Sequence, residues 1–199
     1  MKRPHLLILA AALLSASTSS AQTIRTWTGA GWAWHTPTNW TPIGVPEFTD
    51  TVIVGANANI TIDGPVSIGG TLRWVGGTAF TGNQGTIGLN VAPGGTLEIL
   101  GPFEFSGQLT NAGTIVITND AWLHLKPYSR LRNLANGVVR LASNDELRAY
   151  DLNAWIDNHG LLLKEGAGTR SRVRGTFHQF GTVEARAGAL VGNDRWRGY

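Results

Sequence analysis

The sequence predicts an all-β fold, a right-handed parallel β-helix (β-solenoid) of about six to eight coils with a Trp-rich N-terminal capping segment. Three observations support this prediction. The composition, with 26 glycines and no cysteine, favours strands joined by tight turns and held by packing alone. A short phrase recurs along the chain, and aliphatic residues occupy fixed positions within it. Such internal repetition is the signature of a stacked architecture.

The recurring phrase begins with glycine and continues with Thr or an aliphatic residue. Its six glycines are Gly70, Gly95, Gly113, Gly137, Gly160 and Gly181. The intervals between them are 25, 18, 24, 23 and 21 residues, which suits one solenoid coil, whereas a propeller blade needs about twice that length. An antiparallel β-sandwich is the alternative, but a sandwich has no reason to repeat one phrase at every strand.

Two columns of the repeat are expected to face the core, because alternate residues of a strand point to opposite sides. The first column is aliphatic throughout: Leu72, Leu97, Ile115, Val139, Leu162 and Val183. The second is apolar with one exception: Trp74, Ile99, Ile117, Leu141, Lys164 and Ala185. A one-residue slip that turns Leu161 and Leu163 inward would remove the misfit of Lys164.

An asparagine stands just before three of the repeat glycines, at Asn111, Asn136 and Asn158. Stacked amides at one corner of successive coils can bond their neighbours above and below. Asn and Gly also tolerate the left-handed backbone expected at a sharp corner. We therefore predict an asparagine ladder, and three unconnected turn residues are the alternative.

The N-terminus has the pattern of a secretory signal peptide, residues 1–21. Lys2 and Arg3 precede the apolar run Leu6–Ala16, and Ser19-Ser20-Ala21 offers small residues for cleavage after Ala21. The run of about 11 residues is too short for a membrane span. Loss of Lys2 and Arg3 from the 16 basic residues leaves 14 against 13 acidic, which argues against a nucleic-acid partner. We expect residues 22–60 to form the Trp-rich cap with the first strands, and residues 61–199 the solenoid repeats.

The segment after the signal does not follow the repeat. It contains Trp27-Thr-Gly29, Asn39-Trp40, Gly44-Val-Pro46 and Asp50-Thr-Val52-Ile53. This order, together with the Asn-x-Gly-Thr-aliphatic coils, resembles secreted bacterial parallel β-helix proteins of the autotransporter-passenger and adhesin-like type, which share the pectin-lyase-like fold. The resemblance implies an exported surface protein. It also raises the possibility of polysaccharide lyase or hydrolase activity.

The tryptophans of this segment have two interpretations. An open solenoid end exposes its core and its unpaired strand edges, so end coils need a cap, for which Trp27 and Trp40 are the candidates. Exposed indoles also stack on sugar rings. Trp32 and Trp34, which flank a single Ala and share one strand face, are the candidate carbohydrate-contact residues. At the other end, Trp196 and Tyr199 are candidates for a C-terminal cap.

The sequence contains no pattern that predicts a catalytic centre. The outward column Arg73, Glu98, Val116, Arg140, Leu163 and Glu184 has no acids on neighbouring coils. The nearest approach to a cluster is Asp145, Glu146, Asp151 and Asp157, which we interpret as a solvated loop. Arg170, Arg172 and Arg174 alternate on one strand face and either attract an anionic polymer or protect an edge. We predict no cofactor and no metal, because the histidines share no ligand spacing.

We expect an exported, non-catalytic β-helix module with a structural or adhesive role, located extracellularly or at the cell surface, the periplasm being the other compartment that a Sec-type signal allows. The alternative is a polysaccharide-binding or polysaccharide-processing β-helix. The expected partner is a surface glycan or another extracellular polymer, without membrane insertion. Self-association through an open solenoid end is also expected if the last coil lacks a cap.

Overall fold

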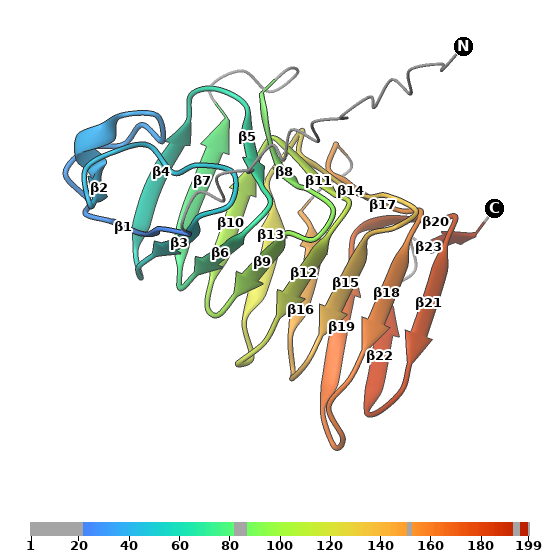
Figure 1. Cartoon of the computed structure of the whole chain (residues 1–199). Coiled ribbons are helices and arrows are strands. Elements are labelled where there is room, and N and C mark those ends of the chain that lie inside the picture. Colours follow the sequence, from blue (N-terminus) through green and yellow to red (C-terminus); the bar gives the residue numbers. More distant parts are fainter. Residues whose placement is uncertain (1–21, 82–86, 151–152, 193–195, 199) are drawn as a thin grey trace, which may run out of the picture.

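Short strands in groups of three build each coil, and equivalent strands of successive coils pair in parallel to form three long sheets (Figure 1). The computed structural model describes residues 22–81, 87–150, 153–192 and 196–198. The predicted signal peptide lies outside these residues. Strands β4 to β21 make six complete coils, and β22 and β23 begin another. The predicted fold class, an all-β parallel β-solenoid, is confirmed.

Each sheet takes one strand from each coil. Sheet A contains, in spatial order, β2 (Trp40–Thr41), β1 (Ile24–Trp27), β3 (Thr51–Val54), β6 (Thr71–Trp74), β9 (Thr96–Ile99), β12 (Thr114–Ile117), β15 (Val138–Leu141), β18 (Leu161–Lys164) and β21 (Thr182–Ala185). Sheet B contains β4 (Ala58–Ile62), β7 (Gly77–Thr81), β10 (Phe103–Ser106), β13 (Trp122–Leu125), β16 (Glu146–Ala149), β19 (Arg170–Arg174) and β22 (Ala189–Gly192). Sheet C contains β5 (Val66–Ile68), β8 (Gly88–Val91), β11 (Gln108–Asn111), β14 (Arg130–Asn133), β17 (Trp155–Asn158), β20 (Thr176–Gln179) and β23 (Trp196–Gly198).

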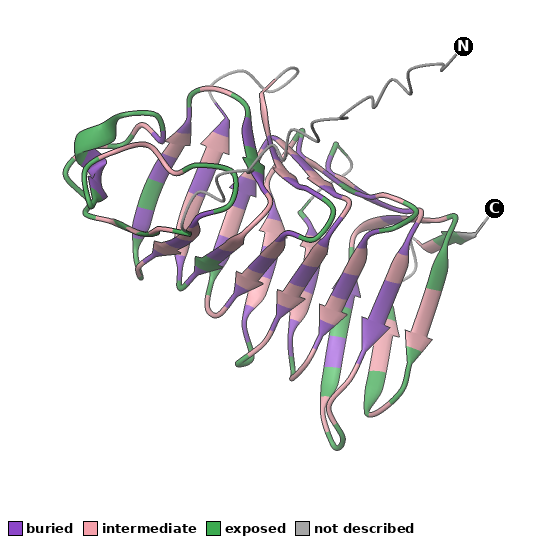
Figure 2. Cartoon of the chain, in the orientation of Figure 1, coloured by how far each residue is buried: buried purple, intermediate pink, exposed green. Residues whose placement is uncertain are grey.

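The core runs along the solenoid axis, enclosed by the inward faces of the three sheets (Figure 2). The recurring glycine phrase forms sheet A, where Leu72, Leu97, Ile115, Val139 and Leu162 are buried on successive strands as predicted. Sheets B and C supply the other walls of the core, for example with Phe103 and Leu131. Almost every strand alternates buried and more exposed residues, because the core lies on only one side of each sheet.

Lys164 breaks this apolar column without a slip of register. Leu161 pairs with Val138 and Lys164 with Leu141, so the predicted slip is wrong. Lys164 points inward and is fully buried. Its Nζ donates to backbone oxygens of the adjoining turn, among them Ser143 O at 3.0 Å, and also to the side-chain oxygen Thr169 Oγ1 at 2.6 Å. The long side chain reaches the polar backbone of the corner, which is why the register is kept.

An amide ladder follows the corner between sheets C and A. Asn111 Nδ2 donates to Asn133 Oδ1 at 2.8 Å, Asn133 Nδ2 donates to Asn158 Oδ1 at 2.7 Å, and Asn158 Nδ2 donates to Gln179 Oε1 at 3.1 Å. The predicted ladder is therefore present, with Asn111 and Asn158 as rungs. The central rung is Asn133 rather than Asn136, which lies in an exposed turn.

The repeat glycines serve close approach between coils rather than a left-handed backbone. None of the six has a positive φ. A Cβ on Gly160 would collide with the carbonyl oxygens of Gly137 and Leu134 in the preceding coil. The corner thus requires glycine because the chain of the neighbouring coil occupies the space of a side chain.

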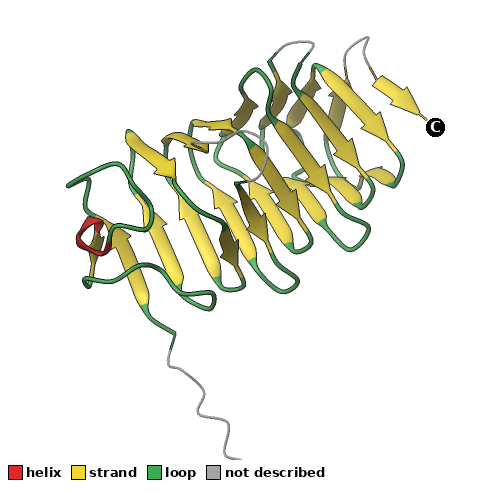
Figure 3. Cartoon of the chain, turned by 90° about the horizontal axis from the view of Figure 1, so that it is seen from above, coloured by secondary structure: helices red, strands yellow, loops and turns green. Residues whose placement is uncertain are grey.

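The N-terminal segment covers the first coil (Figure 3). β1 pairs in parallel with β3 and in antiparallel with β2, and the one-turn 3₁₀ helix η1 (Pro37–Asn39) leads into β2. Residues near Ala33 bond to Thr61 at the edge of sheet B. Trp34 and Trp40 are buried against the end of the core, so the prediction that Trp40 caps the solenoid is confirmed.

Among the described residues, those at the C-terminal end of the solenoid cover the core less completely. Val183, Leu190 and Trp196 are only partly buried against the core, and Trp196 packs on Phe177 with ring centroids 4.7 Å apart. Trp196 therefore contributes to covering this end, as predicted. Tyr199, the other predicted cap residue, lies outside the described residues.

Candidate functional site: a tryptophan-lined pocket

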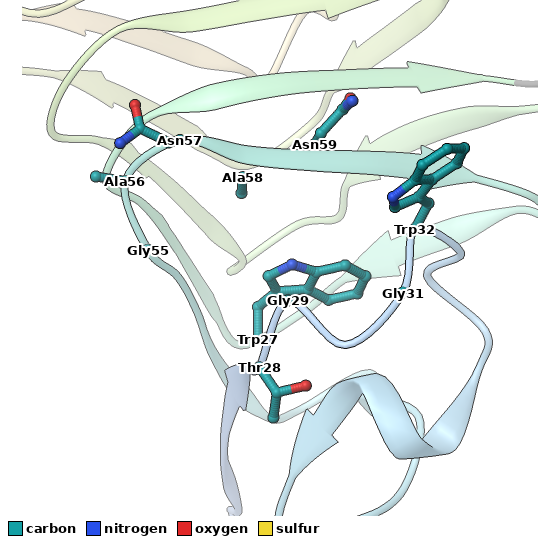
Figure 4. A pocket seen from close by; sticks show the side chains of 10 residues that line it. All are labelled: Trp27, Thr28, Gly29, Gly31, Trp32, Gly55, Ala56, Asn57, Ala58 and Asn59. Atoms are coloured by element: carbon teal, nitrogen blue, oxygen red, sulfur yellow. The ribbon is translucent and has the colours of Figure 1, made fainter.

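A pocket of about 280 Å³ lies between the N-terminal segment and the first coil (Figure 4). Its walls come from the end of β1, the loop after it, and the turn that leads into β4. The lining residues are Trp27, Thr28, Gly29, Gly31, Trp32, Gly55, Ala56, Asn57, Ala58 and Asn59. Two tryptophans and two asparagines are thus among the lining residues, and the amide of Asn57 points away from both indoles (Figure 4).

Trp32 presents its indole to solvent, with 73% of its surface exposed. Its backbone is nonetheless fixed, because its carbonyl oxygen accepts a hydrogen bond from Thr61 N at 2.6 Å and the nearby Trp34 N donates to Thr61 O at 2.9 Å. An exposed indole on an anchored backbone offers a flat apolar surface that a ligand can contact.

Trp27 forms the other aromatic wall and is half buried. Its ring meets Trp40 edge to face at 4.9 Å between centroids, and Trp40 meets Trp34 in the same way at 4.8 Å. Trp40 Nε1 donates to Trp34 O at 2.7 Å. The buried pair therefore sets the orientation of Trp27.

The loop between the two pocket tryptophans is held from beneath by Asn39. Thr28 N donates to Asn39 O at 2.9 Å, and Asn39 Nδ2 donates to Ala33 O at 2.8 Å. A Cβ on Gly31 would approach Asn39 Oδ1 to 2.7 Å, so a larger residue there would displace the Asn39 side chain. The pocket is consequently a preformed shape and not an open loop.

The facing wall carries the polar groups. Asn57 adopts a left-handed backbone, with φ of 60°, at the turn before β4, and Asn59 lies on the outer face of that strand. Both are exposed. A primary amide both donates and accepts hydrogen bonds, as sugar hydroxyls do, while an indole face packs on the C–H face of a sugar ring. Residues of both chemical kinds are thus among those that line the pocket.

The two predicted carbohydrate-contact residues have different positions. Trp32 lines the pocket as an exposed ring, whereas Trp34 has only 1% of its surface exposed and belongs to the cap. The expectation that both share one accessible face is wrong for Trp34, because the chain turns at Ala33 as it bridges to β4. Trp27, predicted as a cap residue, is the second aromatic wall. Asn57 and Asn59 were not predicted, because only the paired coil brings them to the tryptophans.

Charged residues gather on the outer face of sheet B. Four residues lie side by side on successive strands there: Glu104 on β10, His124 on β13, Arg148 on β16 and Arg174 on β19. Glu146 lies beside them, with Oε1 3.3 Å from His124 Nε2 and Oε2 3.6 Å from Arg174 Nε. The predicted alternation of Arg170, Arg172 and Arg174 on one exposed strand face is confirmed.

Aromatic rings surround His124 in this cluster. Trp122 stacks on its imidazole with centroids 3.9 Å apart, and Tyr150 lies 6.0 Å away. Burial lowers the pKa of His124, Glu146 raises it, and Arg148 lowers it further, so that the pKa lies below its usual value of 6.5. The neutral imidazole is thus the favoured form in the folded protein.

The four predicted acidic candidates do not gather. Asp145 is buried and accepts hydrogen bonds from Ser143, Glu146 lies on sheet B, and Asp157 is buried on the outer side of sheet C. The solvated-loop interpretation is therefore wrong for Asp145 and Asp157, which are buried, and for Glu146, which begins strand β16. Asp151 lies outside the described residues. In the described part of the chain, no three His, Asp or Glu side chains are placed to hold a metal ion.

Comparisons with family models, with curated proteins and with solved structures give no match for this chain. In the part of the chain that the structure describes, no helix has the length and apolar character needed to cross a bilayer.

Proposed function

We propose that the chain is an exported β-solenoid module that adheres to carbohydrate at the cell surface or in the extracellular space, through the pocket formed by Trp27, Trp32, Asn57 and Asn59. The observation that carries the proposal is the exposed indole of Trp32 on a pocket whose lining also includes Trp27 and two asparagines. The proposed role is binding, and the described residues that line the pocket are aromatic, small or uncharged polar.

The size of the pocket supports a ligand of one or two sugar rings. Its volume of about 280 Å³ lies near the lower limit for small-ligand sites. The solenoid holds such a site on a rigid support. Weak binding at one site gives strong overall attachment when many copies of the protein bind the same polymer. The predicted signal peptide, residues 1–21, supports an extracellular partner. Self-association through the less covered C-terminal end stays a prediction.

A glycan array tests the proposal, followed by calorimetric titration of the neutral oligosaccharides that it selects. Trp32→Ala is expected to abolish binding without unfolding, because its ring packs little against the core. The matched control is Tyr128→Ala, which removes an aromatic ring that is 62% exposed elsewhere on the surface. Absence of any array signal, or equal loss in both variants, contradicts the proposal.

A second candidate function, processing of polysaccharide, is favoured by the outer face of sheet B. There His124, with its lowered pKa, lies beside Glu146 and on the strand next to Glu104. A neutral imidazole between carboxylates is a candidate general base. Incubation of the protein with acidic and neutral polysaccharides tests this function. New reducing ends that disappear in His124→Phe support processing, and their absence with the wild-type protein rejects it.

A further inference from the structure

A second, separate hollow of about 350 Å³ crosses the outer face of sheet C, from β5 to β14. Its lining consists of Pro65, Val66, Ser67, Ile87, Gly88, Leu89, Asn90, Gln108, Thr110, Arg130 and Arg132. Val66 and Leu89 turn their side chains into the core, so they contribute mainly backbone. This hollow, which we call the sheet C groove, lies on a different face from the tryptophan pocket.

The strand register explains the shape and polarity of the groove. One outward column crosses four successive strands and consists of Ser67, Asn90, Thr110 and Arg132. Because neighbouring strands lie about 4.8 Å apart, this column presents one polar group per coil along the solenoid axis. A second outward column lies two residues earlier on each strand. It begins at Gly88 and continues with Gln108 and Arg130. At Gly88 the space that a Cβ would take is occupied by the backbone of Gln108, so the neighbouring strand approaches closely there.

The two arginines at the end of the groove differ in their partners. Arg130 is anchored: its Nε donates to Asp157 Oδ2 at 2.7 Å, and its guanidinium lies 5.6 Å from the centre of the Trp155 ring. The other carboxylate oxygen of Asp157 lies 2.8 Å from His178 Nδ1, and Asp157 is only 4% exposed. Both oxygens of this buried carboxylate are therefore engaged.

Arg132 is exposed and forms no ion pair with the residues that the structure describes. Asp157, on the next strand, is already bonded to Arg130 and His178. The outward column of the groove therefore carries hydroxyl and amide groups on three strands and ends at a guanidinium that has no ion pair among the described residues. Such a guanidinium is suited to bidentate contact with a carboxylate or sulfate.

We propose that the sheet C groove binds a segment of an acidic polysaccharide, with the sugar chain lying across the strands along the solenoid axis and an anionic substituent on Arg132. Ser67, Asn90 and Thr110 supply hydrogen bonds to ring hydroxyls. A nucleic acid fits less well, because its closely spaced phosphates need several unpaired cations, and Arg132 is the one that the described lining offers.

Calorimetric titration with trimers to hexamers of galacturonate tests the proposal, with galactose oligomers of the same length as the neutral comparison and sulfated oligomers to distinguish the anionic group. Wild-type protein is expected to bind at least one acidic series and not the neutral one. Arg132→Gln should weaken binding roughly tenfold through loss of a charge-assisted contact. Asn90→Leu should also weaken it, although the charge is unchanged.

Two controls separate this site from other effects. Arg170→Gln removes one exposed arginine from sheet B and should leave the affinity within about twofold. Trp32→Ala should not affect binding in the groove, so failure of the tryptophan pocket and failure of the groove are distinguishable. Absence of acidic-oligomer binding, or equal weakening by Arg132→Gln and Arg170→Gln, overturns the proposal.

Discussion

Asn133 and Asn158 are 25 residues apart in the chain, yet Asn133 Nδ2 donates to Asn158 Oδ1 at 2.7 Å inside the protein. The other hydrogen of each amide goes to a backbone oxygen, that of Leu161 for Asn133 and that of Thr182 for Asn158. With Asn111 and Gln179 at its ends, the ladder therefore joins four successive coils through a single file of side chains. It satisfies groups that would otherwise be buried without partners.

Replacement of the central rung tests this ladder. Asn133→Ala removes its own bonds and leaves Asn111 Nδ2 and Asn158 Oδ1 without their ladder partners. We expect a loss of about 3 kcal/mol in the free energy of unfolding, measured by urea titration. Asn136→Ala is the control, because this exposed turn residue should change stability by less than about 0.5 kcal/mol. Similar losses in both variants would show that the ladder is not stabilising.

Asn111, the end rung of the ladder, should contribute less to the free energy of unfolding than Asn133, the central rung. Asn111 Oδ1 is buried and has no partner among the described residues, because Val91 occupies the equivalent position in the preceding coil. Asn111→Ala removes this unsatisfied oxygen together with the bonds that Nδ2 makes. Urea titration should therefore give a smaller loss than for Asn133→Ala. A larger loss would contradict the assignment of Asn111 as the end of the ladder.

The repeat glycines give a second stability prediction. Gly160→Ala places a Cβ against two carbonyl oxygens of the preceding coil, and we expect a loss of about 3 kcal/mol by urea titration. At Gly55 a Cβ would meet nothing within 4 Å and φ is not positive, so Gly55→Ala should be neutral or slightly stabilising. If Gly160→Ala unfolds at the wild-type urea concentration, the close approach does not constrain the corner.

The periodic part of the chain could be predicted from sequence because a solenoid repeats its environment. The inward column from Leu72 to Leu162 and the presence of an amide ladder both follow from that repetition. The register at Lys164 could not be predicted in this way. The buried ammonium of Lys164 is stabilised by hydrogen bonds to backbone oxygens of the adjoining turn. The hydropathy pattern of the sequence does not predict the position of that turn.

The candidate site was only partly predictable. Trp32 could be identified from its residue type, but its separation from Trp34 depends on the bridge between Ala33 and Thr61. The amides of Asn57 and Asn59 join the pocket only through the pairing of distant segments. The gathering of Glu104, His124 and Glu146 was missed because the sequence repeat identified sheet A alone, whereas these residues lie on sheet B.

The lowered pKa of His124 makes stability depend on pH. The pKa of His124 is lower in the folded state than in the unfolded state, where it is about 6.5. The resulting contribution to stability is present above pH 6.5. It is lost as the pH falls from that value towards the lower pKa of the folded state. Glu104, Glu146 and Arg148 act on the same imidazole. His124→Phe, which can still stack on Trp122, should therefore reduce the loss of stability between pH 7.5 and pH 5.5.

Urea titrations across that pH range measure this effect. The matched control is His159→Phe, since His159 also stacks on an aromatic ring, with its centroid 4.5 Å from that of Phe180. An equal reduction of the pH dependence in both variants would mean that His124 is not the responsible group.

The most direct measurement of the proposed function is an NMR titration that follows the indole N–H signals with a neutral oligosaccharide selected on the array. The signals of Trp27 and Trp32 should shift together and saturate, because both rings line the pocket. The signals of Trp122 and Trp155, on the outer faces of sheets B and C, should stay in place. Shifts confined to Trp122 or Trp155, or no shift at Trp32, would contradict carbohydrate binding in the tryptophan pocket.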